Sequence, residues 1–117
     1  MTELEFNALA AQGFNRIPLL AQCMSDLDTP LSLYLKLANQ PNTFLLESVV
    51  GGEHFGRYSF IGLPCQTQLR VRIRKGVATT ELFKQGTLVE SHEGDPLAFI
   101  ASYHERFKVA LRPGLPR

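Results

Sequence analysis

Apolar and polar residues recur with two different periods along this chain. Residues 3–12, "ELEFNALAAQ", have apolar positions at helical spacing, and Gly13 is a suitable C-terminal stop for a short helix. Residues 16–24, "RIPLLAQCM", form a short apolar run in which Pro18 favours an edge strand. The first part of the chain is therefore predicted as a short helix followed by an extended segment.

Residues 28–38, "DTPLSLYLKLA", carry two conflicting signals. Four leucines at alternate positions are typical of a strand. Against this, Asp28 or Thr29 can cap a helix whose first residue is Pro30. Leucine is also a good helix former without a β-branch. The segment is predicted as a helix that ends before Pro41.

The middle of the chain has the pattern of short strands separated by glycine-containing turns. Residues 43–50, "TFLLESVV", and 57–63, "RYSFIGL", are joined by "GGEHFG", which predicts a hairpin. Residues 67–76 alternate leucine, valine and isoleucine with arginine. They lead through a Lys-Gly turn into 77–86 and then into the short strand 87–91.

A final helical pattern, "PLAFIASYHERFKV", covers residues 96–109, with Asp95 as its cap and Pro96 in its first turn. Consecutive short strands between helices favour an antiparallel sheet with helices against it, so the predicted fold class is α+β. The ending "RPGLPR" is typical of a linker. We expect one domain over residues 1–111, a linker that starts at 112–117, and further domains beyond this piece.

The charge composition of the chain limits the kinds of molecule that it is expected to bind. The 117 residues include 12 basic and 11 acidic residues, a net charge of +1 that does not favour nucleic acid or an anionic membrane. The acidic start does not match a signal peptide, and no apolar run has the length of a membrane span. We expect a soluble, cytoplasmic protein in which Cys23 and Cys65 are reduced and buried.

Polar clusters outside the first hairpin give weak functional signals. Four cations lie close together in the arginine-rich strand: Arg70, Arg72, Arg74 and Lys75. The favoured interpretation is the solvated face of a half-buried strand, and the alternative is a phosphate or RNA surface. The histidines stand singly, without zinc spacing: His54, His92 and His104. No catalytic residue and no metal ligand is predicted.

Glu47 and Ser48 interrupt an apolar strand, where an unpaired buried carboxylate would be costly. Across the hairpin, the returning strand brings Arg57, Tyr58 and Ser59 within reach of these two residues. The residues alone leave two interpretations. Glu47 either forms an ion pair with Arg57 while Tyr58 packs in the core, or it receives the ammonium group of a ligand. The ion pair is the commoner arrangement in proteins.

Four segments together resemble the N-terminal region of the anthranilate synthase component I family in its bacterial branch. They are "NRIPLLAQ" at 15–22, "DLDTPLSLYLKLA" at 26–38, "FLLESVVGGEHFGRYSFIGLP" at 44–64 and the terminal "PGLPR". The third segment is the most specific, because Leu-Leu-Glu-Ser is followed by Gly-Arg-Tyr-Ser-Phe-Ile-Gly at the family's spacing. The resemblance covers nearly the whole chain.

The resemblance implies part of an enzyme that converts chorismate and ammonia to anthranilate and pyruvate, with Mg²⁺, in tryptophan biosynthesis. A glutamine amidotransferase subunit supplies the ammonia in this family. The family's catalytic and magnesium residues lie in a C-terminal chorismate-binding domain. The resemblance therefore assigns no catalytic residue here, and it implies an incomplete portion of the fold that is inactive by itself.

The same resemblance implies a site for tryptophan, the end product and feedback inhibitor. The site residues carried over by matching position are Leu46, Glu47, Ser48, Arg57, Tyr58 and Ser59. Under this interpretation Glu47 neutralises the ammonium group of tryptophan. Two alternatives stay open at this point: the related component I of aminodeoxychorismate synthase, and a stand-alone amino-acid-binding module.

Overall fold

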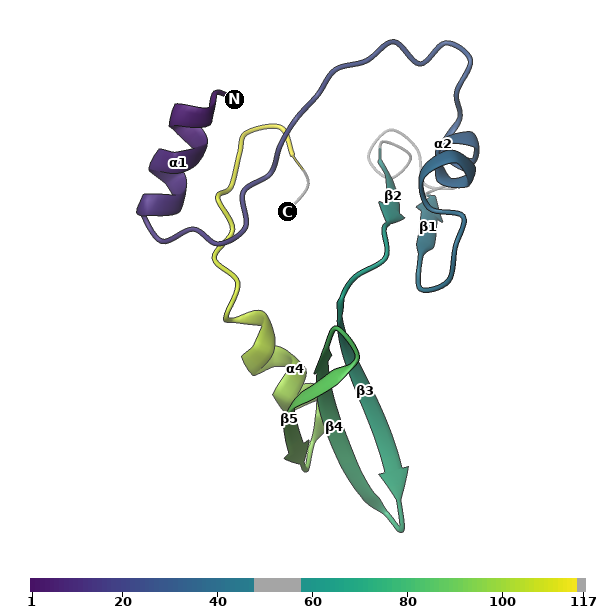
Figure 1. Ribbon diagram of the computed structural model, residues 1–117, viewed down its shortest axis with the longest axis vertical. Coiled ribbons are helices and arrows are strands. Elements are labelled where there is room, and N and C mark those ends of the chain that lie inside the picture. Colours follow the sequence, from purple (N-terminus) through teal and green to yellow (C-terminus); the bar gives the residue numbers. More distant parts are fainter. Residues whose placement is uncertain (48–57, 116–117) are drawn as a thin grey trace. The chain divides into compact units, whose positions relative to one another are not determined.

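The computed structural model describes residues 1–47 and 58–115 (Figure 1). The chain forms two compact units, which are treated separately below. The first unit comprises Met1–Gln22, Leu69–Leu82 and Leu88–Arg117, and the second comprises Cys23–Gln68 and Phe83–Thr87. The helices in the described residues are α1 (Glu3–Ala11), α2 (Pro30–Leu37) and α4 (Pro96–His104).

The described strands form two small antiparallel sheets. One sheet pairs β1 (Phe44–Glu47) with β2 (Ser59–Gly62). The other has the order β3 (Thr67–Arg74), β4 (Val77–Lys84) and β5 (Thr87–Glu93). The predicted α+β class and the predicted run of consecutive strands are confirmed.

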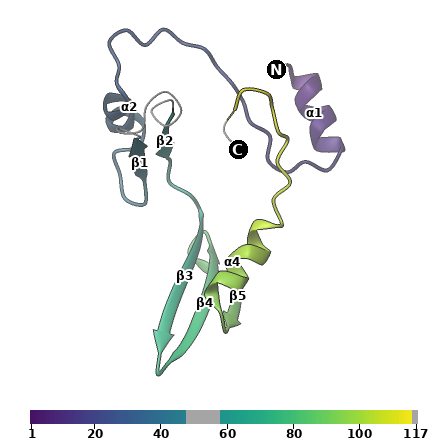
Figure 2. The ribbon, with the colours of Figure 1, turned by 180° about the vertical axis from the view of Figure 1, so that it is seen from behind.

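In the first unit, α4 packs on one face of the three-stranded sheet, as both ribbon views show (Figures 1 and 2). Phe99 is the buried residue of α4, and its ring stacks on His92 of β5 with 5.5 Å between ring centroids. Tyr103 and then Phe107 continue this row of aromatic rings. On the central strand β4, Thr80 and Leu82 are fully buried. Apolar burial between α4 and the sheet therefore contributes to the stability of this unit.

The last helix ends at His104, five residues before the predicted end at residue 109. Asn15 explains the early end, because its side chain donates to the carbonyl of Arg106 at 2.7 Å and accepts from the N–H of Lys108 at 2.6 Å. The carbonyl of Lys108 accepts from the N–H groups of Asn15 and Arg16. Backbone groups that would continue the helix are thus bound to a segment far away in the sequence.

The predicted edge strand at 16–24 is largely wrong. Arg16 forms an isolated parallel bridge with Val109, and residues 17–25 lie in no strand. Pro18 has no N–H with which to extend the ladder. The N–H of Ala110 donates to the carbonyl of Arg16, and Ala110 is buried.

In the second unit, α2 confirms the predicted helix and resolves its conflicting signals. Thr29 is the N-cap and exchanges hydrogen bonds with Ser32 in a capping box, and Pro30 is the first helical residue. Asp28 accepts hydrogen bonds from Lys36 at 2.7 Å and from Ser32 at 2.9 Å. These two bonds, the one from Lys36 first, lower the pKa of the Asp28 carboxyl below its ordinary value.

The expectation that both cysteines are buried is wrong. Cys23 and Cys65 are free thiols and both are exposed. They lie in connecting segments, before α2 and between β2 and β3, where no sheet or helix face covers them. As for membranes, the part of the chain that is described contains no helix with both the length and the apolarity to cross one.

Candidate functional site

The candidate site lies on the hairpin of β1 and β2, whose two strands confirm the predicted pairing. The cross-strand pairs are Phe44 with Gly62, Leu45 with Ile61, Leu46 with Phe60, and Glu47 with Ser59. The connecting turn "GGEHFG" lies outside the described residues, as do Ser48 and Arg57. The proposed Glu47–Arg57 ion pair therefore stays a prediction.

The pairing brings together the site residues that the structure describes. Glu47 of β1 lies directly opposite Ser59 of β2, and Tyr58 immediately precedes β2. Leu46 is adjacent to Glu47 and lies opposite Phe60. Leu46, Glu47, Tyr58 and Ser59 are thus gathered at one end of the hairpin.

The two faces of the hairpin divide these residues. Side chains alternate between faces along a strand, so Leu46 and Phe60 share one face while Glu47 and Ser59 share the other. Leu46 and Phe60 are 58% and 48% exposed, whereas Leu45 and Ile61 are half-buried. Helix α2 packs against both strands, and this difference in exposure indicates that it covers the face of Leu45 and Ile61.

Glu47 itself is exposed in this structure. Its carboxylate thus avoids the penalty for burial in an apolar strand, so Glu47 does not need an ion-pair partner within the chain. An exposed carboxylate with a hydroxyl group on the same face can bind the cationic group of a small molecule.

Two contacts that set the shape of this hairpin were missed by sequence reasoning. The ring of Phe44 lies against Gly62, where a side chain would collide with it. At the start of β1, the hydroxyls of Tyr34 and Thr43 are 2.7 Å apart, and Thr43 also donates to the carbonyl of Gln40 at 2.7 Å. These bonds tie α2 to β1. A glycine inside a strand was the available signal for the first contact, because it often marks a close approach.

The arginine-rich strand is the other polar cluster that the sequence singles out. Arg70, Arg72 and Arg74 are exposed on β3, as a solvated strand face requires. Among the described residues, no group of three or more histidine, cysteine, aspartate or glutamate side chains is placed to hold a metal ion.

The known proteins to which this chain is similar carry the same name. The chain is 56% identical over 117 residues to "Anthranilate synthase component 1" of Neisseria meningitidis serogroup B. It is 56% identical over 118 residues to the protein of the same name from Pseudomonas putida, and 38% identical over 121 residues to that from Acinetobacter calcoaceticus. Each match includes 100% of this chain and 23–24% of the relative.

No family model and no solved structure matches the chain. The chain spans about a quarter of the length of the curated relatives it matches. The resemblance seen in the sequence is confirmed by these relatives: the chain belongs to the anthranilate synthase component 1 family and corresponds to the N-terminal part of its members.

Proposed function

We propose that this chain is the tryptophan-sensing part of an anthranilate synthase large subunit in the cytoplasm. The whole enzyme converts chorismate, with ammonia or glutamine, into anthranilate and pyruvate in tryptophan biosynthesis. Residues 1–111 form the regulatory domain, and 112–117 begin the linker to a chorismate-binding domain that carries out the catalysis. The chain alone is inactive. The name shared by the relatives supports the overall activity.

The observation that carries the tryptophan site is the pairing of Glu47, whose carboxylate is exposed, with Ser59 on the same face of the hairpin. Tryptophan lies across this end of the hairpin. Its ammonium group binds the Glu47 carboxylate, the Ser59 hydroxyl on the same face adds a hydrogen bond, and apolar neighbours cover the indole. The other members of the proposed site are Leu46, Ser48, Arg57 and Tyr58.

Inhibition follows from linkage between two sites. Tryptophan binds more tightly to a state of the enzyme that binds chorismate poorly, and it lowers chorismate affinity by the ratio of its own affinities for the two states. The exposed position of Glu47 suits this role, because the carboxylate is accessible to a ligand before binding.

The partners of the complete enzyme are part of the same proposal. A glutamine amidotransferase subunit supplies the ammonia, and Mg²⁺ is the cofactor of the chorismate-binding domain. The described residues offer no cluster of metal ligands, so the proposal assigns the Mg²⁺ ligands to the rest of the enzyme.

The test uses the full-length enzyme that contains this sequence, with anthranilate fluorescence as the assay. Glu47→Ala removes a charge-assisted hydrogen bond, so the tryptophan concentration for half-inhibition should rise by about tenfold or more. Ser48→Phe should also relieve inhibition. Uninhibited activity should stay near that of the parent enzyme, because neither residue lies in the catalytic domain.

Glu93→Ala is the matched control, since Glu93 also ends a strand and is exposed. It should leave inhibition unchanged. Inhibition curves that coincide for the parent, Glu47→Ala and Ser48→Phe enzymes would contradict the proposed site. Absence of anthranilate formation in the parent enzyme would contradict the proposed activity.

A further inference from the structure

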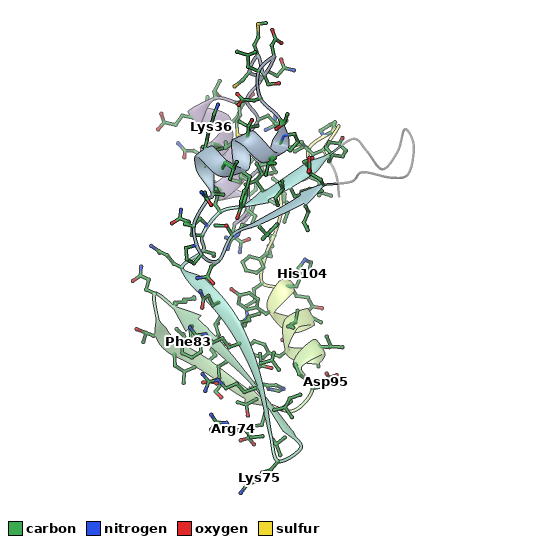
Figure 3. All side chains as sticks on the ribbon, turned by 90° about the vertical axis from the view of Figure 1, so that its right-hand side faces the viewer. Lys36, Arg74, Lys75, Phe83, Asp95 and His104 are labelled. Atoms are coloured by element: carbon green, nitrogen blue, oxygen red, sulfur yellow. The ribbon has the colours of Figure 1, made fainter. Side chains whose placement is uncertain are left out.

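The three-stranded sheet carries a hollow of about 250 Å³ lined by Arg72, Arg74, Thr79, Glu81 and Ser91. On β5, Glu90 and His92 contact residues of the α4 side, Arg106 and Phe99. Because side chains alternate along a strand, Ser91 between them faces the opposite side of the sheet. Figure 3 likewise shows Arg74 on the side of the sheet away from Asp95 and His104 at the two ends of α4. The hollow therefore lies on the face that α4 leaves open.

The hollow contains more positive than negative side chains. Arg72 places its Nε atom 3.6 Å from Oε1 of Glu81, a single ion pair that leaves the outer N–H groups of the guanidinium unused by that carboxylate. Within the described part of the chain, the side chain of Arg74 makes no ion pair and no hydrogen bond. Two guanidinium groups face one carboxylate, and the hollow has a formal charge of +1.

The two hydroxyl groups add uncharged donors to the same wall. Thr79 lies on β4 beside the arginine-bearing strand, and Ser91 lies on β5. A guanidinium group binds carboxylate and phosphate oxygens with two parallel N–H bonds, and hydroxyl groups can fill the remaining acceptor positions of such an anion.

We propose that this hollow is an oxyanion-binding site that takes a carboxylate or a phosphate group. Arg74 makes the paired contact with the anion, Thr79 and Ser91 donate their hydroxyl protons to it, and Glu81 holds Arg72 at the edge of the site. This oxyanion site lies on the three-stranded sheet alone and is independent of the proposed tryptophan site on the β1–β2 hairpin.

The test is titration calorimetry on the full-length protein at low ionic strength, with inorganic phosphate in one series and acetate in another. Arg74→Gln should weaken binding of the anion by about tenfold or more, the usual effect of removing a hydrogen bond to a charged group. Phosphate binding without acetate binding identifies a phosphate site, and the reverse identifies a carboxylate site.

Lys75→Gln is the matched control, because it removes one positive charge from the next residue, which does not line the hollow. It should change the affinity by less than about twofold, as expected for an exposed, screened charge. Equal losses with Arg74→Gln and Lys75→Gln would show general attraction of anions and would overturn the site.

Ser91→Ala tests the site without a change of charge. A weaker affinity in this variant, with an unchanged circular dichroism spectrum, supports the site even if Arg74→Gln disturbs folding. The proposal is overturned if neither anion binds at about 10 mM, far above the concentration that a specific site needs. It is equally overturned if an acidic polypeptide binds this face while both small anions fail.

Discussion

The ring of Phe44 lies against Gly62, its cross-strand partner, so closely that a β-carbon on residue 62 would overlap the ring atoms. A side chain at residue 62 therefore fits only if the ring of Phe44 moves. This contact lies at the opposite end of the β1–β2 pairing from Glu47 and Ser59, and it keeps that pairing in register by allowing Phe44 to cover the adjacent backbone.

Gly62→Ala should destabilise the protein by about 0.5–1.5 kcal/mol, the usual cost of a displaced rotamer, because the half-exposed ring of Phe44 must turn away from the added carbon. The change is measured by urea denaturation. In a Phe44→Ala background the same substitution should be nearly neutral, because the colliding ring is gone. Independent, additive effects of the two substitutions would contradict the contact.

Asn15→Ala should lower the free energy of unfolding by about 1–2 kcal/mol, since the side chain makes two hydrogen bonds to the backbone of residues 106 and 108. Hydrogen exchange of the Lys108 amide should also become faster. Asn7→Ala is the control, because Asn7 is exposed on α1 and its side chain makes no hydrogen bond within the described residues. Equal changes in the free energy of unfolding for Asn15→Ala and Asn7→Ala would contradict the role of the Asn15 hydrogen bonds.

Thr80→Val should raise stability by about 1 kcal/mol. Thr80 is fully buried on the central strand, and its hydroxyl has no hydrogen-bond partner among the described residues. Replacing an unsatisfied buried hydroxyl by a methyl group of similar shape removes its desolvation cost. Thr79→Val on the same strand is the comparison and should not stabilise. A lower melting temperature for Thr80→Val would show that the hydroxyl is satisfied.

Asp28 should titrate below the ordinary range of an aspartate, because Lys36 and then Ser32 donate hydrogen bonds to its ionised form. A lowered pKa means that the stabilisation is present above the pKa of the unfolded chain and is lost as the pH falls through that of the folded chain. Lys36→Gln should raise the pKa of Asp28, as followed by NMR of its carboxyl carbon. An unchanged titration would refute the contact.

The sequence predicts correctly those helices and strands that are determined by residues close together in the chain. The start of α2 at Thr29 and Pro30 can be predicted from the sequence, because the N-cap and its capping-box partner Ser32 lie three residues apart. The two strands of the first hairpin can be predicted from two apolar runs on either side of a glycine-rich segment. Their register, which sets Glu47 opposite Ser59 and Leu46 opposite Phe60, depends on packing that no single segment contains.

The wrong predictions concern features that depend on contacts between residues far apart in the sequence. Phe107 continues the spacing of Phe99 and Tyr103, and its ring packs on Tyr103, yet the helix has already ended. The carbonyl of Lys108 and the N–H of Ala110 bind residues 15 and 16, which the local pattern cannot show. Burial of the two cysteines was inferred from residue type alone, and residue type does not say which connecting segments remain uncovered.

The pairing of Asn15 with Lys108 joins positions that are 93 residues apart. During synthesis the partner of Asn15 does not yet exist when Asn15 leaves the ribosome. At the usual rate of translation, the wait is on the order of ten seconds. The amino-terminal segment must spend that time without its backbone partners, within reach of chaperones and of neighbouring nascent chains. It can join its unit only after residues 106–110, which follow α4, have been made.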